Sequence, residues 1–105
     1  MVYVTTIEPH EIKGPHLHIT RHYYFTCIRG KVVFIIRDPS GKYHEIECNP
    51  QKPSLVCVRN GIAAAIVNPT KEVSKVLVLA DIAWKPNDNE MENIDFPDYN
   101  FKKWA

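Results

Sequence analysis

The feature that most constrains the fold is a series of short β-forming segments, each ended by residues that favour turns. Asp38-Pro39-Ser40-Gly41, for example, has the composition of a type I turn. Turns spaced 8–12 residues apart are typical of an all-β sandwich or barrel. We therefore predict seven or eight strands, rich in β-branched and aromatic residues, at positions 2–7, 22–28, 31–38, 42–47, 54–58, 62–67 and 74–84.

Length and charge narrow the class of protein. The 105 residues suit a single compact domain over residues 1–105. The formal net charge is +1 and the basic residues are scattered, so we expect no nucleic-acid partner. No apolar run reaches about 18 residues, so we expect no membrane segment and a cytoplasmic protein. Cys27, Cys48 and Cys57 lie in apolar segments, which favours buried free thiols over disulfides.

Three of the five histidines lie within seven positions, at His16, His18 and His22. His16 and His18 are two residues apart, so on a strand they share one face, about 7 Å from each other. Both rings then reach one ligand if that face lines a cavity. The alternative is a solvated strand edge. The direction of His22 stays open, because it follows an expected bend at 19–21.

The order of these elements resembles one branch of the cupins. Gly14, His16 and His18 form the G-x-H-x-H pattern, and the following strand ends at Gly30. Later segments, including SLVCVRNG and VLVLADIAWKP, are similar in order and spacing to the dTDP-4-dehydrorhamnose 3,5-epimerase and dTDP-hexose 3,4-ketoisomerase group, the RmlC-like cupins. The resemblance covers nearly the whole chain. It implies an all-β double-stranded β-helix, the cupin jelly roll, in a single small domain.

This resemblance implies an epimerase or isomerase for a nucleotide-activated keto-deoxy sugar, dTDP-linked, in surface polysaccharide biosynthesis, with no cofactor or metal. The base that removes a proton alpha to the ketone falls on His16, and an assisting group on His18. A histidine suits this task because it titrates near neutral pH. Tyr23 completes the catalytic set. The expected substrate-binding residues are Lys13 and Arg21 as anion contacts, with His22, Tyr24 and Asp81.

Departures from the family pattern leave alternatives open. Tyr23 stands where the epimerases have an enolate-stabilising lysine, and Ala64 replaces the histidine of the second motif. A non-catalytic cupin that binds a sugar nucleotide or another small molecule is therefore the second hypothesis. A third is a metal-dependent cupin in which His16, His18 and His22 hold Zn²⁺ or Fe²⁺.

The C-terminal segment, about residues 85–105, is predicted to be an arm. Two prolines, Pro86 and Pro97, favour an extended conformation over a helix. Exposed aromatic rings here would form a large apolar patch, so we expect them to pack across the domain or against a second subunit. Relatives in this group are typically dimers, which implies a homodimer. The rings concerned are Trp84, Phe96, Tyr99, Phe101 and Trp104.

Overall fold

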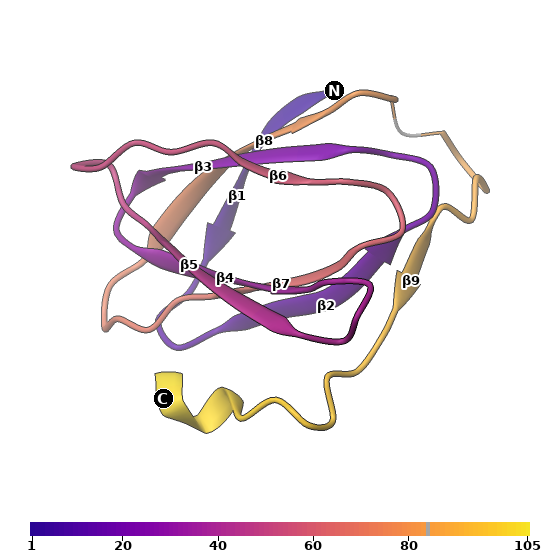
Figure 1. Cartoon of the computed structure of the whole chain (residues 1–105). Helices are drawn as coiled ribbons and strands as arrows, with labels where there is room; N and C mark the ends of the chain where they lie inside the picture. Colours follow the sequence, from indigo (N-terminus) through magenta and orange to yellow (C-terminus); the bar gives the residue numbers. More distant parts are fainter. Residues whose placement is uncertain (84) are drawn as a thin grey trace.

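The computed structural model describes residues 1–83 and 85–105 and confirms the all-β jelly roll (Figure 1). Two antiparallel sheets face each other. Sheet A contains, in spatial order, β1 (Val2–Ile7), β8 (Ser74–Ala80), β3 (Tyr23–Arg29) and β6 (Val56–Val58). Sheet B contains β5 (Tyr43–Cys48), β4 (Val32–Arg37), β7 (Ala63–Val67), β2 (Ile12–His18) and β9 (Met91–Asn93). A short 3-10 helix, η1 (Phe101–Trp104), lies near the C-terminus.

The predicted strands form close to their expected bounds, with one exception. The segment predicted as 74–84 leaves the sheet after Ala80. The carbonyl groups of Ile82 and Ala83 instead accept hydrogen bonds from the Arg21 side chain, at 2.9 and 3.0 Å. These carbonyl groups therefore accept hydrogen bonds from a buried guanidinium and not from a neighbouring strand. Trp84 lies outside the described residues.

The main core fills the space between the two sheets. Along β8, residues alternate between buried and half-buried, so Val76 and Val78 point inward while Leu77 and Leu79 point outward. On β3, Tyr23 and Cys27 are buried in this core and Phe25 packs against it. Period-two patterning thus decides which residues meet between the sheets.

A second core lies on the outer face of sheet B, where the C-terminal arm crosses it. Phe96 is 4% exposed, and its ring lies 5.0 Å from that of Tyr43 and 6.3 Å from that of Phe101, centroid to centroid. Beneath the arm, Ala63 and Ala65 of β7 are small enough for these rings to approach the sheet closely. The aromatic residues after position 90 therefore pack on their own domain, which is the first of the two arrangements expected from the sequence.

One cysteine differs from its prediction. Cys27 and Cys48 are buried, but Cys57 is exposed. Because Val56 and Val58 point into the main core, alternation turns Cys57 to the outer face of sheet A. No helix in the described part of the chain is long and apolar enough to cross a membrane.

Candidate functional site

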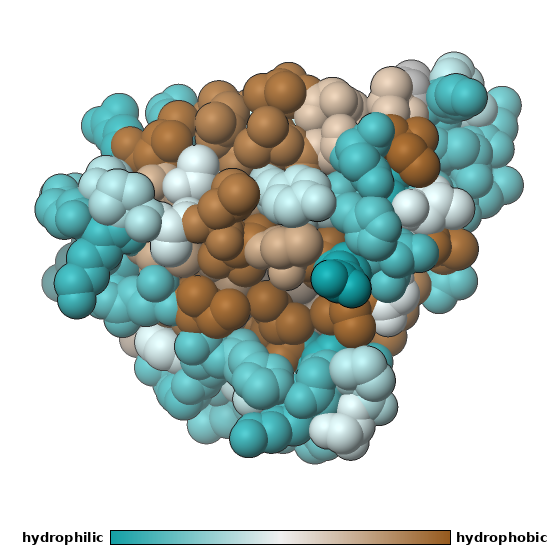
Figure 2. Space-filling model, turned by 45° about the horizontal axis from the view of Figure 1, so that its top comes forward, coloured by the Kyte–Doolittle hydropathy of each residue, from teal (hydrophilic) through white to brown (hydrophobic). Residues whose placement is uncertain are grey.

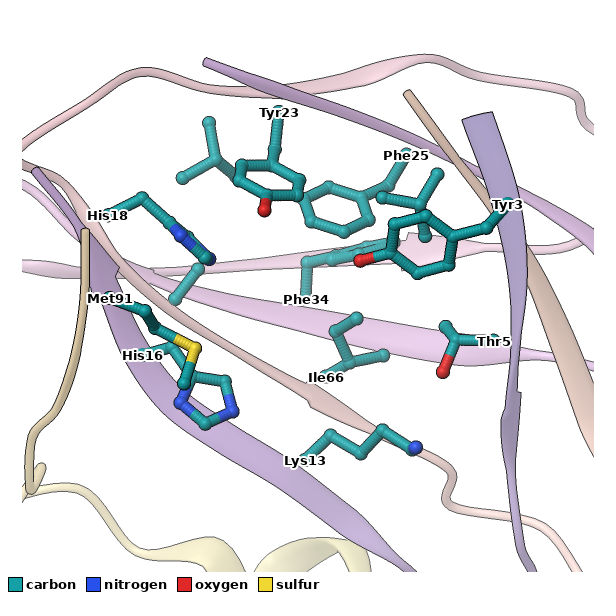
Figure 3. A pocket seen from close by; sticks show the side chains of 13 residues that line it. Tyr3, Thr5, Lys13, His16, His18, Tyr23, Phe25, Phe34, Ile66 and Met91 are labelled. Atoms are coloured by element: carbon teal, nitrogen blue, oxygen red, sulfur yellow. The ribbon is translucent and has the colours of Figure 1, made fainter. Parts of the chain in front are cut away.

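A cavity of about 280 Å³ opens between the two sheets (Figure 3). Its base is aromatic and aliphatic, and polar side chains approach it from β1, β2 and β3. This combination of an apolar cavity with a few convergent polar groups is typical of small-molecule sites. The residues that line it are Tyr3, Thr5, Lys13, His16, His18, Tyr23, Phe25, Phe34, Val58, Ala64, Ile66, Val78 and Met91.

Strand β2 brings three of the expected site residues to the cavity. His16 and His18 share the inward face, as their spacing predicts. Lys13 lies three residues before His16, an offset that would place it on the opposite face of a regular strand. The register of β2 against β7 shifts between Lys13 and His16, and this irregularity returns Lys13 to the cavity side.

Gly14 makes the irregularity sterically feasible. Its φ is +87°, and a Cβ built there would lie 2.9 Å from the His16 backbone nitrogen and 3.0 Å from the Ala64 carbonyl oxygen. A side chain at this position would therefore meet backbone on both sides, in a conformation that L-residues rarely adopt. The glycine of the G-x-H-x-H pattern thus lets the strand carry Lys13 and His16 into one cavity.

His18 is oriented by a buried carboxylate. Its Nδ1 donates a hydrogen bond of 2.8 Å to Oε2 of Glu90, and the Glu90 side chain is 3% exposed. With Nδ1 bound in this way, Nε2 is the ring nitrogen left to exchange a proton with a ligand. The His18 ring also lies against that of Tyr23, with centroids 4.1 Å apart.

Arg21 holds the carboxylate in turn. Its Nη1 donates to Glu90 Oε2 at 2.8 Å and its backbone N–H to Glu90 Oε1 at 2.9 Å. Burial by itself would raise the pKa of Glu90, but hydrogen bonds from His18 and the Arg21 backbone, and the charges of both residues, outweigh it and lower the pKa. Glu90 therefore stays ionised beside His18.

His16 has a different environment. Its Nδ1 donates to Oδ1 of Asn93, at 3.0 Å, in an exposed pair. An amide oxygen orients the ring but brings no negative charge. The two histidines of the pattern therefore differ, because only His18 bonds a buried carboxylate.

Two tyrosines contribute hydroxyl groups from sheet A. Tyr23 is 5% exposed, and Figure 3 shows its hydroxyl and that of Tyr3 directed into the cavity. Burial is the main cause that raises the pKa of Tyr23 and of Tyr3. Both phenols therefore remain protonated near neutral pH and are available as hydrogen-bond donors.

Four residues expected to bind substrate lie outside the cavity lining. Arg21 is 4% exposed and bonded to Glu90, Asp88 and two carbonyl groups. His22 Nδ1 accepts a hydrogen bond from the Asn60 backbone, and the exposed Asp81 accepts one from the His22 backbone. Tyr24 alternates with Tyr23 on β3 and so faces the outer side of sheet A. Alternation on β3 thus turns Tyr24 outward, and the contact with Glu90 holds Arg21 outside the cavity lining.

Several residues at the site had no sequence prediction. Tyr3 and Thr5 alternate with exposed valines on β1, a period-two signal that would have placed them on one face. Glu90 and Asn93 carried no comparable signal, because they lie 72 and 77 residues from their histidine partners. Met91 of β9 closes one side of the cavity from the same segment.

The three histidines do not converge. His22 is absent from the cavity lining that holds His16 and His18. Across residues 1–83 and 85–105, no group of three or more His, Cys, Asp or Glu side chains is arranged to hold a metal ion. Within the described residues, the donor set thus offers two imidazoles at most from the predicted trio.

Comparison with solved structures shows a shared fold. The capsular polysaccharide assembling protein CapF of Staphylococcus aureus matches 90% of this chain at 22% identity and a TM-score of 0.85, over 28% of its own length. ChmJ, a 3'-monoepimerase of Streptomyces bikiniensis, matches 90% at 15% identity and a TM-score of 0.80, over 51% of its length. A dTDP sugar isomerase of Desulfovibrio desulfuricans matches 97% at 14% identity and a TM-score of 0.87, over 71% of its length.

The chain thus spans less than two thirds of CapF and of ChmJ. No curated protein sequence matched it. A family model described as "FdtA: WxcM-like, C-terminal" matches residues 1–100.

Proposed function

The chain belongs to the FdtA, WxcM-like C-terminal family, and from this membership we propose that it is an epimerase or isomerase of a nucleotide-activated keto-deoxy sugar. The observation that carries the proposal is the His18–Glu90 pair at the cavity, with a bond of 2.8 Å. The nucleotide is proposed to be dTDP, since ChmJ was solved in complex with dTDP-quinovose. A role in surface polysaccharide synthesis is supported by CapF, a capsular polysaccharide assembling protein.

His18 acts in this proposal as the base. Ionised Glu90 accepts a hydrogen bond from Nδ1–H and so favours the tautomer with a free Nε2 lone pair. When Nε2 takes a proton from the carbon next to the sugar ketone, the imidazolium that forms is stabilised by the carboxylate. A positioned base contributes typically 10²–10⁴-fold to such a step. This geometry supports the reverse of the expected roles, with His18 as base and His16 assisting.

The electrons of the broken C–H bond move onto the ketone oxygen, which becomes an enolate. The proposed donor to this oxygen is Tyr23, whose hydroxyl Figure 3 shows directed into the cavity. Return of a proton to the same carbon from the other face gives an epimer. The isomeric ketone forms instead when the enolate oxygen takes up a proton, the hydroxyl on the deprotonated carbon loses one, and a proton is added to the former carbonyl carbon. Tyr3, on the far strand β1, is the proposed donor for the opposite face.

The size of the cavity supports a sugar as the buried part of the ligand. Its volume, about 280 Å³, lies at the small end of the roughly 300–1,000 Å³ that bury drug-sized ligands. A hexose ring suits this space, and the nucleotide would lie at the mouth. Lys13 is the proposed contact for the diphosphate or sugar oxygens. It binds as a point charge.

A binding cupin without turnover is the second candidate. Tyr23 in place of the enolate-stabilising lysine favours it, because a neutral hydroxyl stabilises an oxyanion less than an ammonium group does. The two candidates make different predictions for proton exchange at the sugar carbons.

The test is incubation with a dTDP-4-keto-6-deoxy sugar in D₂O, followed by NMR of the C3 and C5 positions. We expect deuterium incorporation by the native chain, its loss in His18→Ala, and a partial decrease in His16→Ala. His10→Ala, in an exposed turn, serves as the matched control. Tight binding without exchange would favour the binding cupin, and full exchange by His18→Ala would refute the assignment of the base.

A further inference from the structure

Both histidines of the cavity take their hydrogen-bond partners from one short segment of the chain. Asn93, in β9, bonds His16 at 3.0 Å, and Glu90, just before β9, bonds His18 at 2.8 Å. β9 pairs with β2, with Asn93 directly opposite His16, and Figure 1 shows the two strands side by side. The orientation of each ring therefore depends on where this segment lies along β2.

β9 gains little stability from its own residues. All three are exposed, and among the described strands β9 is the last of sheet B, with β2 as its neighbour. The bond between Asn93 and His16 is itself exposed. Water competes for both groups there, so the net stabilisation from this bond is small. The position of β9 therefore depends on contacts made at its two ends.

The end that precedes β9 is fixed by a buried ion pair. Glu90 accepts hydrogen bonds from the side chain and the backbone of Arg21, at 2.8 and 2.9 Å, and both side chains are buried. The Glu90 carbonyl group also accepts a hydrogen bond from the Ile19 N–H, at 2.7 Å. Position 90 thus has an anchor of its own.

The end that follows β9 is fixed by Phe96, three residues after Asn93. It is the first buried residue after β9. Its ring packs against those of Tyr43 and Phe101 in the outer core of sheet B, and the Arg37 guanidinium lies over it, 5.1 Å from the ring centroid. The enclosed ring therefore sets where the chain can leave β9.

This outer core lies behind the strand that carries the histidines. Leu17, between His16 and His18 on β2, packs in the outer core, so one strand contacts the arm on one face and the cavity on the other. Sheet A is different, because its outer face leaves Val2 64% and Leu55 62% exposed. Figure 2 shows apolar side chains gathered on that side of the molecule. The aromatic arm thus covers the sheet that holds the two imidazoles.

We propose that Phe96 is a positioning residue for His16, because by anchoring the arm behind sheet B it keeps Asn93 at the imidazole on the cavity side. Phe96 is not among the residues that line the cavity, so it acts through Asn93. His18 depends on it much less, since Glu90 is anchored by Arg21. The effect of Phe96 on turnover rests on the proposed function, whereas its effect on the His16 ring does not.

The first test is ¹⁵N NMR of the histidine rings, which identifies the tautomer of each. In the native chain both rings should carry the proton on Nδ1. In Phe96→Ala, His16 should change to the mixture of tautomers of a free imidazole, while His18 keeps its Nδ1 proton. Val32→Ala removes fully buried side-chain atoms from the main core and is the matched control for lost stability, so both rings should keep the native tautomer. Phe96→Leu, which retains most of the apolar volume, should restore most of the His16 signal.

Amide hydrogen exchange measures the docking of the segment at each end. The Ile94 N–H bonds the Pro15 carbonyl group, at 3.2 Å, near Phe96, and the Ile19 N–H bonds Glu90 at the other end. In Phe96→Ala, the Ile94 amide should exchange on the order of 10²-fold faster, the factor expected when loss of a buried phenylalanine ring acts on one opening equilibrium. The Ile19 amide should change much less.

The proposal is overturned if His16 keeps the Nδ1 proton in Phe96→Ala, or if both histidines lose it together. Equal acceleration of the Ile19 and Ile94 amides would overturn it as well, because the segment would then open as a whole. If Phe96→Ala does not fold, Phe96→Leu decides by the same criterion, with a smaller change confined to His16 expected.

Deuterium exchange into the sugar separates this proposal from the proposed function. Adding Phe96→Ala to His16→Ala should cause no further loss of exchange, because the two changes act through one residue. A further loss in the double variant would contradict the role of Phe96. If the native chain exchanges no deuterium at all, the proposed function fails, and the NMR comparison of His16 with His18 still decides the role of Phe96.

Discussion

The substitution Glu90→Gln removes one charge from the site while keeping the shape of the side chain. In the native chain, Oε2 accepts hydrogen bonds from His18 Nδ1 and Arg21 Nη1, both at 2.8 Å, and Oε1 accepts one from the Arg21 backbone at 2.9 Å. Glutamine keeps one acceptor oxygen and turns the other position into an NH₂ donor. In either orientation, the new NH₂ group therefore faces an N–H donor of Arg21, from its side chain or from its backbone.

The expected loss of folding stability in Glu90→Gln follows from how deeply this ion pair is buried. The side chains of Glu90 and Arg21 are 3% and 4% exposed. A buried donor without an acceptor costs about 1–3 kcal/mol, and loss of one partner from a buried ion pair costs about 3–5 kcal/mol. Asp88, which is 27% exposed, continues to pair with Arg21. We therefore expect the lower end, about 3 kcal/mol, out of roughly 5–15 kcal/mol for a whole domain.

Urea denaturation followed by far-UV circular dichroism measures this loss. With a slope of about 1–3 kcal/mol per molar urea, the midpoint should fall by about 1–3 M. Glu92→Gln, at an exposed residue of the adjoining strand β9, is the matched control and should stay within about 0.5 kcal/mol of the native chain. If Glu90→Gln lowers the free energy of unfolding by less than about 1 kcal/mol, the reasoning is refuted, because the buried donors would then be satisfied without the carboxylate.

Three further results are expected from the structure. Phe96→Ala should cost about 3–5 kcal/mol in urea denaturation, since its buried ring anchors the arm; an unchanged midpoint would contradict this packing. Gly30→Ala should lower the melting temperature, because its φ is +76° and the new Cβ would clash with Ser74 Oγ and lie 3.0 Å from the Val73 carbonyl oxygen. Gly41→Ala, at φ +89° with no atom within 4 Å, should lower it less. The pKa of Glu90 is lowered in the folded state. The contribution of its charge to the stability of the fold is therefore complete above the unfolded pKa of about 4.3, and it is lost as pH falls through the folded pKa. Acid should for this reason lower the melting temperature of the native chain more than that of Glu90→Gln.

The strands and the inward faces were predictable because each depends on residues close in sequence. Alternation in β3 separates Tyr23, which faces the cavity, from Tyr24, which faces outward, and the sequence left open only which of the two sets lay inside. The pairing of His16 with His18 follows from the same period. Lys13 is different, because its placement needs the register shift at Gly14, which no period predicts.

The contacts that orient the site were not predictable in the same way. Glu90 meets His18 across 72 residues, and its position depends on how the arm leaves β8 and returns beside β2. Arg21 shows the consequence. A basic residue near the cavity suggests an anion contact, yet its guanidinium is occupied by two carboxylates and two carbonyl groups. Long-range packing therefore decides whether a charged residue binds a ligand or holds another residue.

The position of Ala64 connects the departure from the cupin pattern with the shape of the cavity. Ala64 is the register partner of His16, and both line the cavity, so the side chain at position 64 points inward beside the imidazole. A histidine there would bring a third imidazole to the cavity that His16 and His18 line. It would also fill much of a cavity of about 280 Å³. Alanine leaves that space open, and in the proposed function the proton transfer is therefore assigned to His18 with Glu90 behind it.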